Sequence, residues 1–72
     1  MVRIPIQSKN IKSAAYDQCN LTAEIEFHNG KIYQYYPFYE NQWEDFKNAP
    51  SQGSWFNKNV RSRKSIACKK IK

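Results

Sequence analysis

Apolar and polar residues alternate along residues 21–28, LTAEIEFH, so that the apolar ones share one side of an extended chain. A period of two over this length predicts a half-buried β-strand. Asn29-Gly30 follows, and both residues tolerate the positive φ of a tight turn. Residues 31–36, KIYQYY, are rich in residues that favour strands. The pattern therefore predicts a β-hairpin over residues 21–36.

The register of this hairpin decides where Tyr33 and Tyr35 point. A two-residue loop at Asn29-Gly30 would place both tyrosines beside the glutamates of the preceding strand. A three-residue loop over residues 28–30 would pair Ile25 with Tyr33 and turn both rings toward the core. A shift of one residue exchanges the two faces completely. We expect the three-residue loop, because it supplies large rings to a small core and leaves the intervening glutamine outside.

The other elements follow from similar patterns. Residues 1–10 contain a proline and indicate an extended arm or edge strand, and residues 11–17 indicate a first strand. Residues 39–48 carry aromatic side chains at helical spacing with acids between them, which predicts a short amphipathic helix. Ser51 is a suitable N-cap for a second helix, expected over about residues 52–61.

These elements predict an α+β fold, a small antiparallel three-stranded β-meander followed by two short helices. Residues 11–61 would form the domain, after the arm or edge strand of residues 1–10. Residues 62–72 would be a basic tail without defined structure. A chain of 72 residues is one domain with a thin core. Small domains often gain stability by association, so we expect a homo-oligomer, a dimer or a tetramer.

Charge is distributed unevenly along the chain. Residues 1–50 have a net charge of −1, whereas residues 51–72 hold seven Lys or Arg and no acid, a net charge of +7. A segregated basic segment is typical of proteins with a phosphate-bearing partner. The basic residues of 58–64 adjoin Trp55 and Phe56, which favours phosphate contact. The last lysines, in residues 69–72, are interpreted as a solvated tail.

Several classes of function are disfavoured. The only histidine, His28, lies at the expected turn, so no nucleophile has an evident base beside it. Cys19 and Cys68 are interpreted as free thiols, and no spacing typical of a zinc site occurs. We expect a non-enzyme with no catalytic residue, no metal and no cofactor. No apolar run suits a signal peptide or a membrane span, so we expect a cytoplasmic protein without a membrane partner.

Four segments resemble the KTSC domain in order and spacing. They are SAAYD (13–17), LTAEIEFHNGKIYQYY (21–36), Trp43 with Phe46, and APSQGSWFNKNVR (49–61). The most specific pieces are the YxY at Tyr33-Gln34-Tyr35 and the A-x-S-x-G-x-[FYW]-[FL]-N-x-x-[IV]-R block that runs from Ala49 to Arg61.

The resemblance covers about residues 4–61 and concerns a family named for its occurrence at the C-terminus of some lysyl-tRNA synthetases. It implies a small non-enzymatic module, for which RNA binding has been suggested, and the family also occurs as stand-alone proteins of bacteria and their viruses. This chain departs from the pattern at Pro37-Phe38-Tyr39, where the family usually has a longer stretch ending in Val-Pro. It also carries the basic extension after Arg61.

Three functions remain open. The favoured one is a binder of a compact phosphate-bearing nucleotide, with aromatic rings and arginines closing on the ligand between protomers. Backbone N–H groups at the start of the second helix would bind an anion, with Gly53 allowing close approach, and Arg61 would grip a phosphate in a bidentate way. In stand-alone viral members, the family context suggests sequestration of cyclic nucleotide signals of antiviral defence, inside the bacterial host cell.

The first alternative is an RNA or single-stranded nucleic-acid-binding accessory domain, with bases stacked on rings and phosphates neutralised by Lys and Arg. The second alternative is a protein-interaction module or inhibitor that uses the acidic helix at Glu40, Glu44 and Asp45. The candidate ligand-binding residues are Tyr16, Tyr35, Ser51, Gly53, Trp55, Asn57, Lys58, Arg61 and Arg63.

Overall fold

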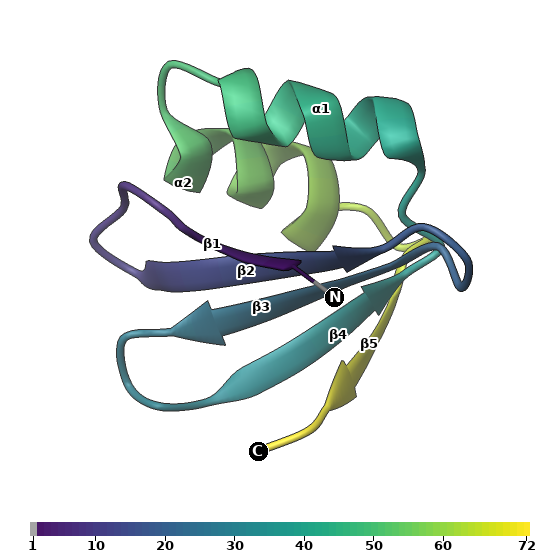
Figure 1. Cartoon of the computed structure of the whole chain (residues 1–72), viewed down its shortest axis with the longest axis horizontal. Coiled ribbons are helices and arrows are strands. Elements are labelled where there is room, and N and C mark those ends of the chain that lie inside the picture. Colours follow the sequence, from purple (N-terminus) through teal and green to yellow (C-terminus); the bar gives the residue numbers. More distant parts are fainter. Residues whose placement is uncertain (1) are drawn as a thin grey trace.

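The computed structural model describes residues 2–72 as a five-stranded antiparallel sheet whose one face is covered by helices (Figure 1). The strands are β1 (Val2–Pro5), β2 (Ile11–Asp17), β3 (Thr22–Phe27), β4 (Ile32–Tyr36) and β5 (Ala67–Lys70), and they lie in this order across the sheet. The helical segments are α1 (Glu40–Asn48), α2 (Gln52–Phe56) and the π-helical η1 (Asn57–Arg61).

The expected α+β class is confirmed, but three strands is too few. β1 pairs with β2 as an edge strand, with Ile4 opposite Ala14. The expectation of a tail without structure over residues 62–72 is wrong for β5, which pairs with β4 and places Cys68 opposite Tyr35. All four β5 residues are exposed, so the strand carries no hydrophobic pattern that sequence periodicity could detect. Backbone pairing holds it at the edge.

The β3–β4 hairpin has the register of the three-residue loop. Ile25 lies opposite Tyr33 and Ala23 lies opposite Tyr35, which confirms the expected pairing. Gly30 adopts a φ of +86°, a conformation that glycine accepts without strain. Tyr35 is only 6% exposed and belongs to the core.

The core lies between the sheet and the helical layer. Phe38, Phe46 and Phe56 are fully buried there, and the rings of Phe46 and Phe56 have centroids 5.9 Å apart. Trp43 and Phe46 of α1 are buried, as their helical spacing predicts, whereas Tyr39 lies at the N-cap and is exposed. The Ser51 hydroxyl accepts a hydrogen bond from the Ser54 N–H at 3.4 Å, which confirms Ser51 as the N-cap of α2.

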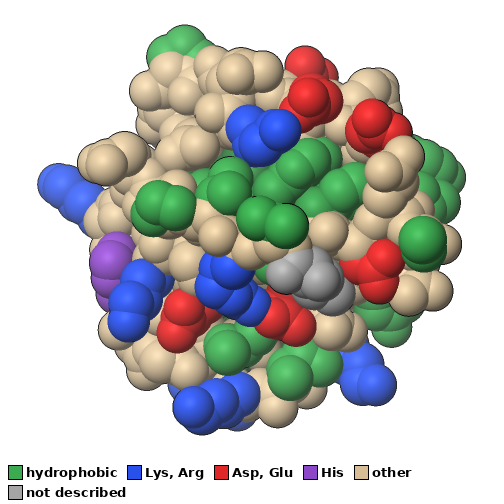
Figure 2. Space-filling model, viewed as in Figure 1, with side chains coloured by type: hydrophobic (Ala, Val, Ile, Leu, Met, Phe, Trp, Pro, Cys, Tyr) green, Lys and Arg blue, Asp and Glu red, His purple; other side chains and the backbone are tan. Residues whose placement is uncertain are grey.

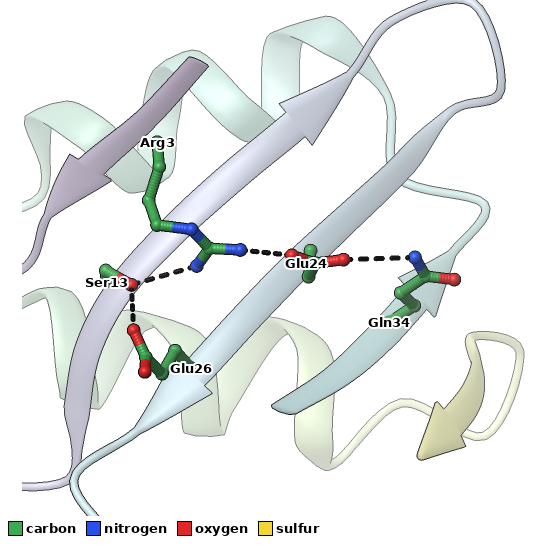
Figure 3. A network of polar contacts seen from close by, with 5 residues as sticks. All are labelled: Arg3, Ser13, Glu24, Glu26 and Gln34. Carbon is green, nitrogen blue, oxygen red and sulfur yellow. Dashed lines mark hydrogen bonds and ion pairs between the residues drawn. The ribbon is translucent and has the colours of Figure 1, made fainter. Parts of the chain in front are cut away.

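A polar network ties β1 to the open face of the sheet (Figure 3). Arg3 donates to the Ser13 hydroxyl at 2.9 Å and forms an ion pair with Glu24. The Ser13 hydroxyl donates to Glu26 at 2.8 Å, and the Gln34 amide donates to Glu24 at 3.2 Å. The two carboxylates are therefore occupied in cross-strand contacts.

Candidate ligand-binding cavity

A cavity of about 650 Å³ lies on the helix side of the sheet, beyond the region that the helices cover. Four segments surround it: the β1–β2 loop, the β3–β4 hairpin, the end of η1 and strand β5. Its aromatic wall consists of Phe27, Tyr33 and Tyr35. The hairpin register creates this wall, because it turns Tyr33 and Tyr35 of β4 to the helix side of the sheet.

The charge of this cavity is positive. Among the described residues that line it, Lys9, Lys31 and Arg61 are cationic and none is acidic. The other polar members of the lining are Asn10, His28, Asn29 and Cys68. Rings beside cations, without a carboxylate, form a suitable surface for an anion that also has a flat apolar part.

Arg61 is positioned by the π-helical segment η1. It is the last residue of this segment, and its guanidinium carbon lies 6.0 Å from the centre of the Phe27 ring. This geometry is a cation–π contact that holds the side chain over the aromatic wall. Short π-helical segments are frequent at functional sites, where they change the direction of a side chain. The change to i→i+5 pairing after Phe56 is a detail that helical periodicity does not reveal.

Tyr35 provides a polar group to the cavity. Its ring packs edge-on against Phe56 with centroids 5.0 Å apart. Burial and the neighbouring Cys68 thiol raise the pKa of the Tyr35 hydroxyl, whereas the Arg61 charge opposes this shift. The hydroxyl therefore stays protonated and able to donate a hydrogen bond at physiological pH.

The loops at the cavity rim are tied together. The His28 backbone N–H donates to the Asn10 carbonyl at 2.9 Å, and the His28 Nε2 lies 3.1 Å from the Ser8 carbonyl. The Ser8 hydroxyl in turn accepts from the backbone N–H groups of Asn10 and Ile11. These bonds hold the β1–β2 loop, with Lys9, beside the hairpin.

The structure brings only two of the sequence-predicted ligand residues, Tyr35 and Arg61, into this cavity. Tyr16 lies elsewhere, with its ring stacked on Trp43 at 5.3 Å and its hydroxyl donating to the Phe38 carbonyl at 2.6 Å. Burial, followed by the charges of neighbouring carboxylates, raises the pKa of Tyr16. It lines a separate groove of about 320 Å³ between β1 and α1.

The start of α2 is closed by contacts within the protein. Ser51 caps the helix, and a Cβ placed on Gly53 would lie 2.7 Å from the Ser8 hydroxyl. Gly53 thus allows the β1–β2 loop to approach the helix. Trp55 is half-buried and packs on Phe46, with ring centroids 5.5 Å apart.

The remaining predicted residues are exposed and lie outside the cavity lining; they are Asn57, Lys58 and Arg63. Sequence reasoning missed Lys9, Lys31 and Phe27 as cavity residues. The alternation of residues 21–28 was a usable signal for Phe27, since it places this ring on the same side of the strand as the buried Ile25. Lys31 adjoins Phe27 in the hairpin itself, where the Phe27 N–H donates to the Lys31 carbonyl at 2.9 Å. Lys9 joins them only through the pairing of β1 with β2, which no residue pattern specified.

The groove between β1 and α1 differs in character from the cavity. Figure 2, which looks onto this side, shows hydrophobic side chains gathered between the helical layer and the front strands, with acidic side chains beside them. Val2, Ile4 and Trp43 supply apolar lining, and Glu40 and Glu44 lie at its helix side, where Lys47 forms an ion pair with Glu44. With two acids and one lysine in its lining, this groove suits a phosphate-bearing ligand less well than the cavity does.

Both cysteines are free thiols, as the sequence suggested, and both are exposed. No cluster of three potential metal ligands occurs among the described residues. None of the described helices combines the length and apolar character of a membrane span.

The comparisons with known proteins agree on one family. The KTSC domain family matches residues 7–63. A lysine–tRNA ligase of Nostoc punctiforme is 40% identical over 53 residues, and one of a second Nostoc strain is 34% identical over 53 residues. Each match covers 74% of this chain but only 9% of the ligase, so the chain spans a small part of these relatives.

A solved structure extends the similarity to almost the whole chain. A KTSC domain protein from Yersinia pestis superimposes with a TM-score of 0.89 at 32% identity, covering 99% of this chain and 97% of that one. The match thus includes the two edge strands that lie outside residues 7–63. Family match, sequence identity and shared fold together place this chain in the KTSC domain family.

Proposed function

We propose that this protein binds a compact phosphate-bearing nucleotide in the cavity beside the β3–β4 hairpin and does not transform it. The observation that carries the proposal is the composition of the cavity, an aromatic wall with three cations and no acid among its described lining residues. Its volume of about 650 Å³ lies within the range of about 300–1,000 Å³ typical of small-molecule sites.

The arrangement suits the two parts of a nucleotide. A base can stack on an aromatic ring, which contributes about 1–3 kcal/mol per base. Arg61 lies directly over the Phe27 end of the wall, where its guanidinium can hold a phosphate next to a stacked base. The Tyr35 hydroxyl would donate a further hydrogen bond to the ligand.

Within this class we favour a cyclic oligonucleotide. Such a ligand carries internal phosphates and several bases in a compact form, so one molecule presents both features that the cavity matches. The cavity is open to solvent on one side, and a second protomer of a dimer or tetramer would close it. The role we propose is that of a viral protein that sequesters cyclic nucleotide signals of antiviral defence in the bacterial cytoplasm, by analogy with stand-alone members of the family.

An RNA ligand is the alternative. Basic residues outside the cavity are exposed along and after η1, namely Lys58, Arg63 and Lys64. Two relatives are lysine–tRNA ligases, which makes an RNA partner reasonable for the domain. An extended RNA would use these exposed residues together with Arg61, whereas a compact nucleotide would use Arg61 with the other cavity cations, Lys9 and Lys31, and none of the exposed residues outside the cavity.

The test is a thermal-shift panel with cyclic and linear di- and trinucleotides, short single-stranded RNA and a tRNA, each at low and moderate salt. A ligand at 100 times its Kd stabilises the folded state by about 2.7 kcal/mol. For so small a domain this is a shift of Tm of more than ten degrees, at about 4–8 °C per kcal/mol.

Arg61→Ala and Arg63→Ala form a matched pair, because both arginines are exposed and only Arg61 lines the cavity. We expect Arg61→Ala to abolish the shift and Arg63→Ala to preserve it. Equal losses in both variants, with affinity falling linearly in log salt, would favour RNA instead. An unchanged shift in Arg61→Ala would contradict nucleotide binding in this cavity.

A further inference from the structure

The two edges of the sheet differ in the backbone groups that they present. At the β1 edge, the Ile6 N–H donates to the Lys12 carbonyl at 3.1 Å, toward β2. Because successive residues of an antiparallel strand alternate in direction, Arg3 and Pro5 face outward. Pro5 has no N–H, so this edge is poor in donors and resists further pairing.

The β5 edge presents a regular set of donors and acceptors. The Ile71 N–H donates to the Ile32 carbonyl at 2.8 Å, toward β4. The same alternation directs Ala67 and Lys69 to β4 and leaves the backbone N–H and C=O groups of Cys68 and Lys70 facing outward. All four residues of β5 are exposed, and none of them is proline.

Positive charge flanks this edge on both faces of the sheet. Lys69 lies opposite Gln34, on the open face, and Lys70 lies opposite Tyr33, on the helix side. An extended chain added at this edge would carry side chains on both faces. Acidic side chains on either face would therefore meet a lysine.

A second copy of this chain does not provide such a segment. All six acids of the sequence lie in β2, β3 or α1, where their backbone is already paired within the sheet or within a helix. Two β5 strands would instead bring lysines opposite one another, and like charges in directly opposed positions are destabilising. The occupant that fits is thus a different protein.

We propose that β5 binds an extended acidic segment of another protein, which adds to the sheet as a sixth strand. The segment would pair over about 13 Å, the length of four residues at 3.3 Å each. Main-chain hydrogen bonds would give affinity and the lysines would select for acidic side chains. A nucleic-acid phosphate matches less well, since it offers only acceptors and would lie against the outward carbonyls of Cys68 and Lys70.

The probe is a fluorescent peptide of alternating Glu and Val, eight residues long, tested by fluorescence anisotropy. Lys70→Ala removes the charge only, whereas Lys70→Pro also removes the outward N–H without breaking a bond to β4. We expect Lys70→Pro to bind about fivefold more weakly than Lys70→Ala, the loss expected for one hydrogen bond. Circular dichroism of both variants checks that the fold is kept.

A second peptide with methyl groups on its alternate backbone nitrogens has the same charge but cannot donate to the edge. We expect it to bind at least about tenfold more weakly than the parent peptide, because more than one hydrogen bond is lost. A single-stranded oligouridylate tests the competing partner. The proposal is wrong if the parent peptide does not bind, or if both peptides bind with the same affinity. It is also wrong if the oligouridylate binds more tightly than the parent peptide and Lys70→Ala and Lys70→Pro do not differ in affinity.

Discussion

Arg61 and Phe27 join the end of the helical layer to the last residue of β3 through a contact of 6.0 Å between guanidinium and ring centre. Because Arg61 is exposed, the interaction is worth about 0.5–1 kcal/mol. A double-mutant cycle of Arg61→Ala and Phe27→Leu, measured by urea unfolding, should give a coupling energy in this range. The pair Arg63→Ala and Phe27→Leu is the control and should be additive. Additivity in both cycles would show that the contact contributes nothing.

Substitution of Gly53 should destabilise the fold, because a larger side chain would not fit at this position. A Cβ at this position would lie 2.7 Å from the Ser8 hydroxyl, which is held by two backbone N–H groups and cannot move without breaking those bonds. Alanine favours a helix over glycine by about 1 kcal/mol, but overpacking costs about 1–3 kcal/mol, so we expect Gly53→Ala to be destabilising. The measurement is the urea midpoint. Ser8→Gly in the same chain should recover part of the loss, and a stabilised Gly53→Ala would refute the close approach.

Tyr35 should contribute through its ring far more than through its hydroxyl at neutral pH. Tyr35→Ala should lose about 3–5 kcal/mol of unfolding free energy, the range for large buried aromatic side chains, and Tyr35→Phe about 1 kcal/mol. The exposed Tyr39 is the control, with little loss in Tyr39→Ala. A near-neutral Tyr35→Ala would place this ring outside the core.

Tyr35 also predicts how the stability of the fold changes at alkaline pH. The folded state raises the pKa of Tyr35 above its ordinary value of 10.0, mainly by burial. The unfolded chain therefore releases this proton first, and stability should be fully present below pH 10 and fall as pH rises above it. Tyr35→Phe should make this decline shallower. An equally steep decline in Tyr35→Phe would assign the effect to other groups.

Much of the fold could be predicted because the central elements bury one face. The alternation of residues 21–28 and the rings of Trp43 and Phe46 report side chains that meet the core, and Asn29-Gly30 reports the turn between two strands. The three-residue loop followed from the requirement that Tyr33 and Tyr35 fill a thin core, and the structure confirms that register. These signals are local, and each depends on only a few neighbouring residues.

The edges and the cavity could not be predicted in this way. β5 has no buried side chain, so its lysines resemble a solvated tail although its backbone is paired. Lys9 and Lys31 are separated in sequence and lie in loops, and only the pairing of β1, β2 and β3 brings them around one cavity. The N-terminus of α2 was expected to bind an anion, but whether Gly53 is open depends on the position of the β1–β2 loop.

The Ser13–Glu26 hydrogen bond predicts how stability changes in acid. The Ser13 hydroxyl, followed by the positive charges of Lys12 and Arg3, lowers the pKa of Glu26 in the folded state. As pH falls, the folded chain therefore binds this proton at a lower pH than the unfolded chain does. The stabilisation is therefore present above the unfolded-state pKa and is lost as pH falls through the folded-state pKa.

Ser13→Ala removes the largest cause of this shift, so unfolding free energy should decline less steeply between neutral and acid pH than in the wild type. Chemical unfolding at a series of pH values measures the slope. Glu26→Gln should reduce the slope to a similar degree, because no proton can bind there. In the Glu26→Gln background, Ser13→Ala should then have no further effect on the slope, although it still loses the Arg3 contact at every pH. If Ser13→Ala retains the wild-type slope, the Ser13 hydroxyl does not control the Glu26 carboxylate, and the acid dependence arises at other carboxylates. Asp17 is one of them, because its pKa is also lowered, mainly by its hydrogen bond from Asn20.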